Sequence, residues 1–120
     1  MSTAIKQSST NQYNKQQALN KCPITITLEK IGSRWKPIIL YNLVSGTLRY
    51  SELRRAMPLI SEKMLIQQLR ELERDQLVQR IVHPVVPPHV EYRLTRQGRG
   101  LSPVLSAMSA WGIKNGWKKG

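Results

Sequence analysis

The sequence predicts an α+β fold that is mostly helical, and three observations support it. Residues 61–74 carry leucines at helical spacing, with a short helical segment and a turn just before them. Two candidate strands follow, a segment rich in Val and Ile at 77–83 and an alternating segment at 89–94, separated by a stretch with three prolines. The remaining residues return to helical spacing. This order predicts helices first, then a hairpin, then helices again.

The overall composition limits the possible functions. The chain has 120 residues, which fits one domain, and a net charge of +12, which attracts polyanions. Nucleic acid is the usual partner of such a protein, and a membrane surface is the alternative. No segment approaches the ~18 apolar residues of a transmembrane helix, so we expect no membrane insertion. Without the apolar core of a signal peptide, the expected location is the cytoplasm.

The chain is expected to have two parts, a disordered tail at 1–12 and one domain at 13–120. The tail is polar and low in complexity, and residues Asn14–Lys21 suggest a short helix. Proline is favoured at the first helical position, so Pro23 makes Cys22 the candidate N-cap of a helix that ends at Gly32. Its buried residues would lie at helical spacing: Ile24, Leu28 and Ile31.

A second helix is expected to begin within residues 33–37. Pro37 would lie in its first turn, where a missing amide costs little, and Gly46 would end it. The apolar content predicts that this helix is mostly buried, through Ile38, Ile39, Leu40, Leu43 and Val44.

Ser51 is the expected cap of a third helix, Glu52–Met57. Leu53 would face the core, with Arg54 and Arg55 facing outward. Residues 57–60 then form a turn into the helix at 61–74. A short helix, a tight turn and a second helix with a polar outer face are the order of a helix-turn-helix.

Residues 61–74, SEKMLIQQLRELER, have two different faces when placed on a helix. Ser61 is a good N-cap, because its hydroxyl can accept a hydrogen bond from an amide of the first turn. One face is a leucine stripe that should be buried: Leu65, Leu69 and Leu72. The other face suits a DNA major groove, although a solvated face is the alternative: Lys63, Gln67, Arg70 and Arg74.

The segments Leu77–His83 and His89–Leu94 read as two strands of a hairpin. The second alternates cleanly, with Val90, Tyr92 and Leu94 on one face. The prolines between them cannot donate to a ladder, so they belong to the tip. A hairpin directly after a helix-turn-helix is a wing, and the predicted fold is a winged helix-turn-helix with a two-stranded wing.

The last segment is predicted to be helical and to reach a second subunit. Thr95 would cap it, Pro103 breaks the pattern, and Ser102 is a candidate for a second cap. An apolar stripe then extends past any small core and predicts dimerisation through terminal helices: Leu101, Leu105, Met108 and Trp111.

Six pieces of the chain lie in order with short gaps. They are GSRWK at 32–36, RYSEL at 49–53, ISEKML at 60–65, QLRELE at 68–73, VPPHVEYRLT at 86–95, and Gly98 with Leu101. Together they resemble the HxlR-type winged helix-turn-helix regulators of bacteria, in the MarR-like superfamily, over about three quarters of the chain. Gln76 departs from the family, which usually has Gly there, and would be strained if the position needs a positive φ.

The resemblance implies a homodimer on a palindromic operator in double-stranded DNA, associated with the bacterial nucleoid when bound. It also implies, in many members, a cysteine near the N-terminus that senses oxidants or electrophiles. Fold and charge together favour DNA contact for Lys63, Gln67 and Arg70. Other candidates are Ser61, Arg49, Tyr50, Arg54, His89 and Arg93, for which a cap, a core position or a solvated surface is the alternative.

Cys22 is a candidate sensor or an inert buried thiol, with neither favoured. A helix N-terminus and the nearby cations favour the thiolate, and the chain has no second cysteine. No grouping of residues suggests catalysis or a cofactor. Cys22, His83 and His89 match no zinc spacing, so no metal is expected. The rival function is a winged-helix module that binds another protein and uses its charge for solubility.

Overall fold

The structure is a computed structural model that describes residues 22–118. The predicted tail at 1–12 and the predicted helix Asn14–Lys21 lie outside the described residues. The chain divides into two compact units, Met1–Gly32 and Ser33–Gly120. Among residues 22–118, no helix combines the length and apolar character that crossing a membrane requires.

The N-terminal unit contains α2, Pro23–Ile31, with the predicted boundaries. Cys22 is the N-cap, and the Gly32 amide donates to the Leu28 carbonyl at 2.6 Å. Ile31 is buried, but the prediction that Ile24 and Leu28 are buried is wrong, since they are 69% and 58% exposed. Helical spacing identifies an apolar face, but it does not say which surface covers that face.

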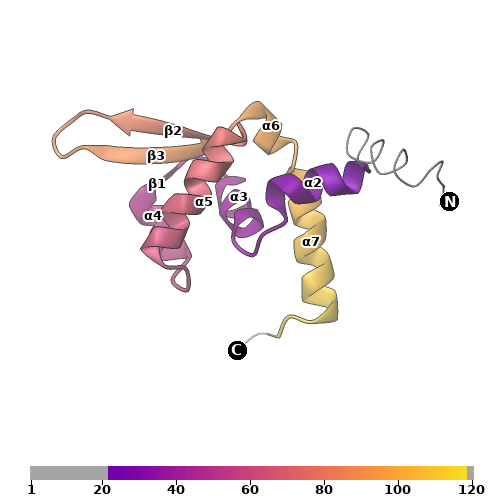
Figure 1. Cartoon of the computed structure of the whole chain (residues 1–120). Coiled ribbons are helices and arrows are strands. Elements are labelled where there is room, and N and C mark those ends of the chain that lie inside the picture. The colour runs from indigo at the N-terminus through magenta and orange to yellow at the C-terminus, as the bar shows by residue number, and fades with distance from the viewer. Residues whose placement is uncertain (1–21, 119–120) are drawn as a thin grey trace. The chain divides into compact units, whose positions relative to one another are not determined.

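The second unit holds the remaining described elements (Figure 1). In chain order they are α3 (Lys36–Leu43), β1 (Leu48–Arg49), α4 (Tyr50–Ala56), α5 (Glu62–Arg74), β2 (Val78–His83), β3 (His89–Leu94), α6 (Arg96–Arg99) and α7 (Ser102–Asn115). The strands form one antiparallel sheet in the order β1-β3-β2. The winged helix-turn-helix order of the sequence analysis is therefore present, with a third strand added.

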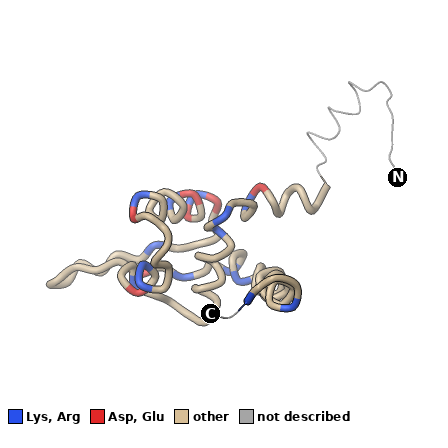
Figure 2. Tube along the Cα trace, turned by 90° about the horizontal axis from the view of Figure 1, so that it is seen from below, with Lys and Arg blue, Asp and Glu red and all other residues tan. Residues whose placement is uncertain are grey.

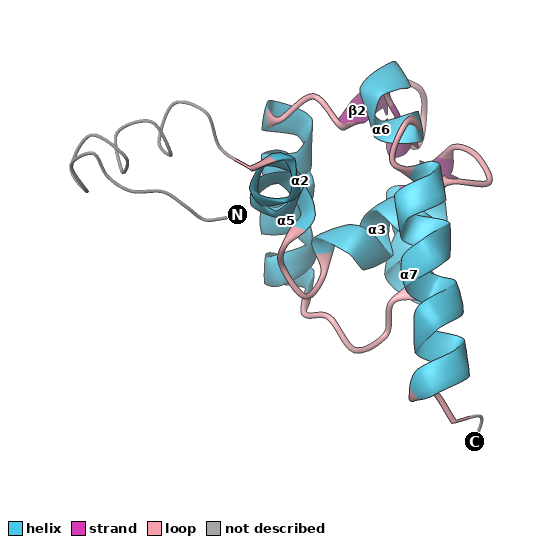
Figure 3. Ribbon diagram, turned by 90° about the vertical axis from the view of Figure 1, so that its right-hand side faces the viewer, coloured by secondary structure: helices cyan, strands magenta, loops and turns pink. Residues whose placement is uncertain are grey.

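The core of this unit is built mainly from leucines of α3, α4 and α5 and from the base of the sheet. Ile39, Leu40 and Leu43 of α3 are buried as predicted, whereas Ile38 and Val44 are 42% and 39% exposed, contrary to prediction. These two lie on the outer side of a helix that is apolar nearly all round. α7 runs beside α3 (Figure 3), and its Leu105 is buried.

The third helix, α4, begins at Tyr50, two residues earlier than predicted. Its N-cap is Arg49 and not Ser51, because the Arg49 amide donates to the Glu52 carboxylate at 2.7 Å and fixes the first turn there. Leu53 is fully buried. Arg54 does not simply face outward, since it is half-buried and its guanidinium donates to the Ile60 carbonyl at 2.9 Å. That bond closes the turn before α5.

The wing is a regular hairpin in which β2 pairs with β3 from Val78↔Leu94 to His83↔His89. Tyr92 and Leu94 face the core, as the alternation predicts. The two-residue strand β1 was not predicted. It pairs Leu48 with Tyr92 on the other side of β3. The hairpin extends beyond the helices of this unit (Figure 1).

The residues after the wing change direction twice. The Thr95 hydroxyl accepts from the Gly98 amide at 3.0 Å and caps α6, as predicted. Helix α6 ends at Arg99 and α7 begins at Ser102, so the helical pattern is interrupted just before Pro103. Ser102, however, does not cap α7. Leu101 occupies the N-cap and Ser102 is already the first helical residue. Proline is tolerated in this first turn because the amide it lacks would have no helical partner.

Candidate nucleic-acid interface

Helix α5 has the two faces that the sequence predicts. Its N-cap is Ser61, whose hydroxyl accepts from the Met64 amide at 3.1 Å. The leucine stripe is fully buried: Leu65, Leu69 and Leu72. The polar side chains on the opposite side are exposed: Lys63, Gln67, Arg70 and Arg74. The helix therefore offers cations and an amide to any partner on this side.

Two polar links fasten α5 to the start of α3. The Ser33 hydroxyl donates to Gln68 Oε1 at 3.0 Å, and Lys36 Nζ lies 2.6 Å from Glu71 Oε1. Gln68 and Lys36 are both buried. The hydrogen bond from Lys36, with one from Gln67, holds the pKa of Glu71 below its usual 4.5. These links show that Ser33 and Lys36, predicted at the start of the second helix, also fasten that helix to α5.

A side chain of the polar face is itself held by this network. Gln67 Nε2 donates to Glu71 Oε2 at 3.4 Å, so one carboxylate receives bonds from Gln67 and from Lys36. The first partner lies one turn away on the same helix, and the second lies 35 residues away in sequence. Only the first could have been predicted from helical spacing.

A cleft of about 790 Å³ separates α5 from the wing. Three arginines from three different elements line it, Arg49, Arg70 and Arg80, together with one acid, Glu73. Tyr50 also lines it, and its hydroxyl donates to Glu62 at 3.4 Å. Partial burial raises the pKa of Tyr50 above its usual 10.0. The cleft brings together predicted residues from α4 and α5.

Arg80 was missed by the sequence analysis. It lies in β2 opposite Tyr92, whose buried side chain marks the face of the hairpin that turns toward the helices. The alternation of β3 combined with the register of the hairpin would have placed it there. Arg93, which was predicted, lies on β3 and its Nε donates to Gln79 Oε1 at 2.9 Å across the hairpin.

The outer part of the wing carries no formal charge. Residues 82–90 contain no Lys, Arg, Asp or Glu (Figure 2), and Val86 in the loop is 99% exposed. Cations flank the wing only nearer its base, at Arg80 and Arg93. Electrostatic attraction to a phosphate backbone therefore arises from α5, the cleft and the wing base.

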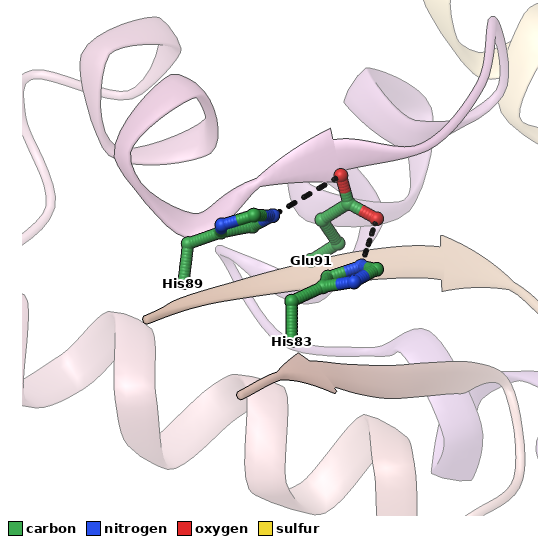
Figure 4. A group of neighbouring side chains, drawn as sticks. All are labelled: His83, His89 and Glu91. Atoms are coloured by element: carbon green, nitrogen blue, oxygen red, sulfur yellow. Dashed lines mark hydrogen bonds and ion pairs between the residues drawn. The ribbon is translucent and has the colours of Figure 1, made fainter. Parts of the chain in front are cut away.

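Two histidines and a glutamate lie together where the hairpin meets its loop (Figure 4). His83 Nε2 is 2.8 Å from Glu91 Oε1, and His89 Nε2 is 3.9 Å from Glu91 Oε2. The two imidazoles are stacked, with centroids 4.5 Å apart. The hydrogen bond from His83 holds the pKa of Glu91 below its usual 4.5. In the sequence, His83 and His89 form no zinc spacing with Cys22; in the structure their neighbour is Glu91.

The predicted sensor and the predicted dimerisation residues have different surroundings. Cys22 is exposed, and it makes no side-chain capping bond at α2. In α7, Met108 is 49% exposed and Trp111 is 70% exposed. Leu105, predicted to face a partner, is only 3% exposed because it packs inside its own chain. Leu101 is half-buried.

Comparison with known proteins identifies the family. Residues 30–119 match the model of the HxlR-like helix-turn-helix family. The chain belongs to this family. Two HTH-type transcriptional regulators of Bacillus subtilis are similar to it. YdeP is 50% identical over 93 residues, covering 78% of this chain and 73% of YdeP. YtcD is 53% identical over 92 residues, covering 77% of this chain and 73% of YtcD.

A solved relative supports the fold of this HxlR-like protein. The structure titled "Redox regulator HypR in its oxidized form" matches with a TM-score of 0.76 and 46% identity, covering 81% of this chain and all of that one. These relatives are transcriptional regulators and not enzymes. The HxlR-like chain is accordingly a transcriptional regulator with a helix-turn-helix in a winged fold.

Proposed function

We propose that this regulator binds a palindromic operator as a homodimer and that α5 reads the major groove. The observation that carries the proposal is the exposed row Lys63, Gln67 and Arg70 above a fully buried leucine stripe. Lysine, glutamine and arginine at one-turn spacing reach phosphates and the acceptor edges of bases. Ser61, at the start of α5, lies where a helix N-terminus attracts a phosphate.

The cleft beside α5 would receive the phosphate backbone next to the groove. Arg49, Arg70 and Arg80 line it and outnumber the single Glu73. Arg93, His89 and Tyr50 are further candidate contacts, and Arg54 is a weaker one because the Ile60 carbonyl already occupies its guanidinium. Contacts of this kind position the protein, while those from α5 specify sequence.

Exposed apolar side chains on the terminal helices support dimerisation. Met108 and Trp111 of α7 are exposed, and, in the other unit, Ile24 and Leu28 of α2 are exposed as well. Apolar groups that a single chain leaves in water favour a second copy of that chain. A two-fold dimer would place two copies of α5 about 34 Å apart, which matches successive major grooves on one side of the duplex.

Salt dependence of binding separates this proposal from its rival, a module that binds another protein. An operator would first be selected from fragments of the host genome. Affinity for that duplex and for a scrambled one is then measured by fluorescence anisotropy between about 50 and 200 mM salt. We expect both affinities to fall steeply with salt and the operator to remain preferred. An absence of salt-dependent duplex binding would favour the protein-binding module.

We further propose that Cys22 responds to an oxidant or electrophile. Its thiol is exposed, and the similar HypR is titled a redox regulator in oxidised and reduced forms. The chain has one cysteine, so the products are an alkylated thiol, a sulfenic acid, a mixed disulfide or a bridge to the partner's Cys22.

A diamide or quinone titration tests this role. Treatment should change the operator affinity of the wild type and leave Cys22→Ser unchanged. An equal response of both proteins, or resistance of native Cys22 to labelling, would make the thiol structural.

A further inference from the structure

We propose that His83, His89 and Glu91 bind one divalent transition-metal ion, of the Zn²⁺ class, where the wing meets its loop. One ligand atom from each residue can be chosen so that all three lie within 4.8 Å of one another. The Glu91 carboxylate reaches both imidazoles, with one oxygen toward each ring (Figure 4). The proposal concerns metal binding by the protein without DNA, so its test does not depend on the proposed DNA binding.

The register of the hairpin explains why these three residues converge. His83 and His89 form the last pair of the ladder, and Glu91 opposes Ile81, two residues before His83. Directly opposed residues and residues two apart on one strand lie on the same face of a sheet. The three side chains therefore occupy one face of the hairpin, as a direct neighbour and a diagonal neighbour of His83.

The spacing is close to what a shared metal ion requires. Zn–N and Zn–O distances of about 2.0–2.2 Å in a tetrahedral site place ligand atoms roughly 3.3 Å apart. The distances from His83 Nε2 to Glu91 Oε1, 2.8 Å, and from His89 Nε2 to Glu91 Oε2, 3.9 Å, fall on either side of that value. Because the two imidazoles are stacked, binding requires both rings to turn until their Nε2 atoms face one ion. Each imidazole would coordinate through Nε2 and keep its proton on Nδ1.

The donor set also fits the chemistry of such an ion. Two imidazoles and a carboxylate are ligands that zinc accepts, with water completing the fourth position. The side chains are 25–38% exposed, so an ion can reach them. Arg49, which opposes Glu91 across β1 and β3, is the nearby cation that weakens metal binding.

A bound ion would have two physical effects on the wing. It would cross-link β2 to β3 at the loop, where the ladder ends. It would also bring positive charge to residues 82–90, which have no formal charge of their own. Both effects fall at the loop end of the hairpin, where His89 also lines the cleft beside α5.

Zinc titration of the full chain against a chromophoric chelator tests the site. We expect one ion per chain, and at least a tenfold loss of affinity in His83→Ala, in His89→Ala and in Glu91→Gln. Glu73→Gln removes an exposed carboxylate of α5, and Cys22→Ser removes the thiol; both should bind zinc as the wild type does. Melting curves without metal should show that all variants fold.

Nuclear magnetic resonance gives a second, site-resolved measurement. The chain contains two histidines, so both imidazoles can be followed by long-range ¹H–¹⁵N spectra during the titration. We expect the Nε2 resonances of both to shift together and to saturate at one equivalent of Zn²⁺. Zinc affinity that none of the three hairpin substitutions weakens, or that Cys22→Ser abolishes, would overturn the proposal. So would saturation that leaves either imidazole unshifted.

Discussion

Lys36 Nζ contacts Glu71 Oε1 at 2.6 Å and joins the first turn of α3 to the last turn of α5. Glu71 also accepts the bond from Gln67, so the orientation of an exposed amide depends on a buried lysine in another helix. Rotation of α5 about its own axis would break the contact with Lys36 and would move every side chain of the outer face of α5.

This ion pair makes stability depend on pH. The pKa of Glu71 is lowered in the folded protein, so its contribution is complete above about 4.5 and is lost as the pH falls through the folded value. We expect Glu71→Gln to lower the urea midpoint at about pH 7, and the difference from the wild type to shrink as the pH falls below about 4.5. Glu73→Gln removes an exposed carboxylate of the same helix and is the control for the loss of one charge. A constant gap for Glu71→Gln across this range would contradict the assignment.

Arg70 is expected to carry sequence preference. If it reads a base, Arg70→Ala should cost about 1–3 kcal/mol of operator binding and relax the preference at one position of each half-site. The measurement is binding to a set of operators with single substitutions. Lys114→Ala removes one exposed charge from α7 and should leave the preference intact. Equal losses on operator and scrambled duplex would make Arg70 a phosphate contact, and no loss would refute its place in the groove.

Met108 and Trp111 are expected to support the dimer. Light scattering should give twice the 13.8 kDa chain mass. Replacing both residues with glutamate should yield monomers that bind the operator weakly, because charges would then be buried at the interface. Val86→Glu adds one charge at the fully exposed wing loop and should leave the mass unchanged. A wild-type monomer at micromolar concentration would exclude this interface.

Gln76 is expected to be a strained position. Its φ is +62°, the conformation that glycine adopts without penalty. A non-glycine residue in this conformation is strained by on the order of 1–3 kcal/mol. Glycine would relieve this strain, but its greater conformational entropy in the unfolded chain would offset part of the gain in stability. We therefore expect Gln76→Gly to stabilise the protein by about 0.5–1 kcal/mol in urea unfolding. Gln76→Ala keeps a Cβ and should give no gain, whereas an equal gain would trace the effect to the side chain.

The features that sequence predicted well are local ones. Ser61 capped α5 because a serine three residues before an amide suffices for that bond, and the leucine stripe followed from spacing alone. The sequence was also informative at Gln76, where an expected glycine was missing and a positive φ was found.

The features that it missed depend on distant residues. Strand β1 has two residues, too few for an alternating pattern, and exists because β3 lies beside it. Residue type predicted Ser51 as the cap of α4. The N-cap is instead Arg49, because the Glu52 carboxylate accepts a hydrogen bond from the Arg49 amide. The group of His83, His89 and Glu91 required the hairpin register. Exposure of Ile24 and Leu28 shows that an apolar face need not be covered within the chain.

The short strand β1 restricts how this regulator can be switched. Leu48 and Arg49 pair with Tyr92 and Glu91, and α4 begins at the very next residue, so no slack separates the wing from the helix-turn-helix. This direct link favours movement of the wing and the helix-turn-helix as one unit. In the proposed dimer, we therefore expect an inducer to act on the distance and angle between the two DNA-binding units. Mutations that hold the regulator in its DNA-bound or its DNA-free state should therefore be sought at the interface of the proposed dimer.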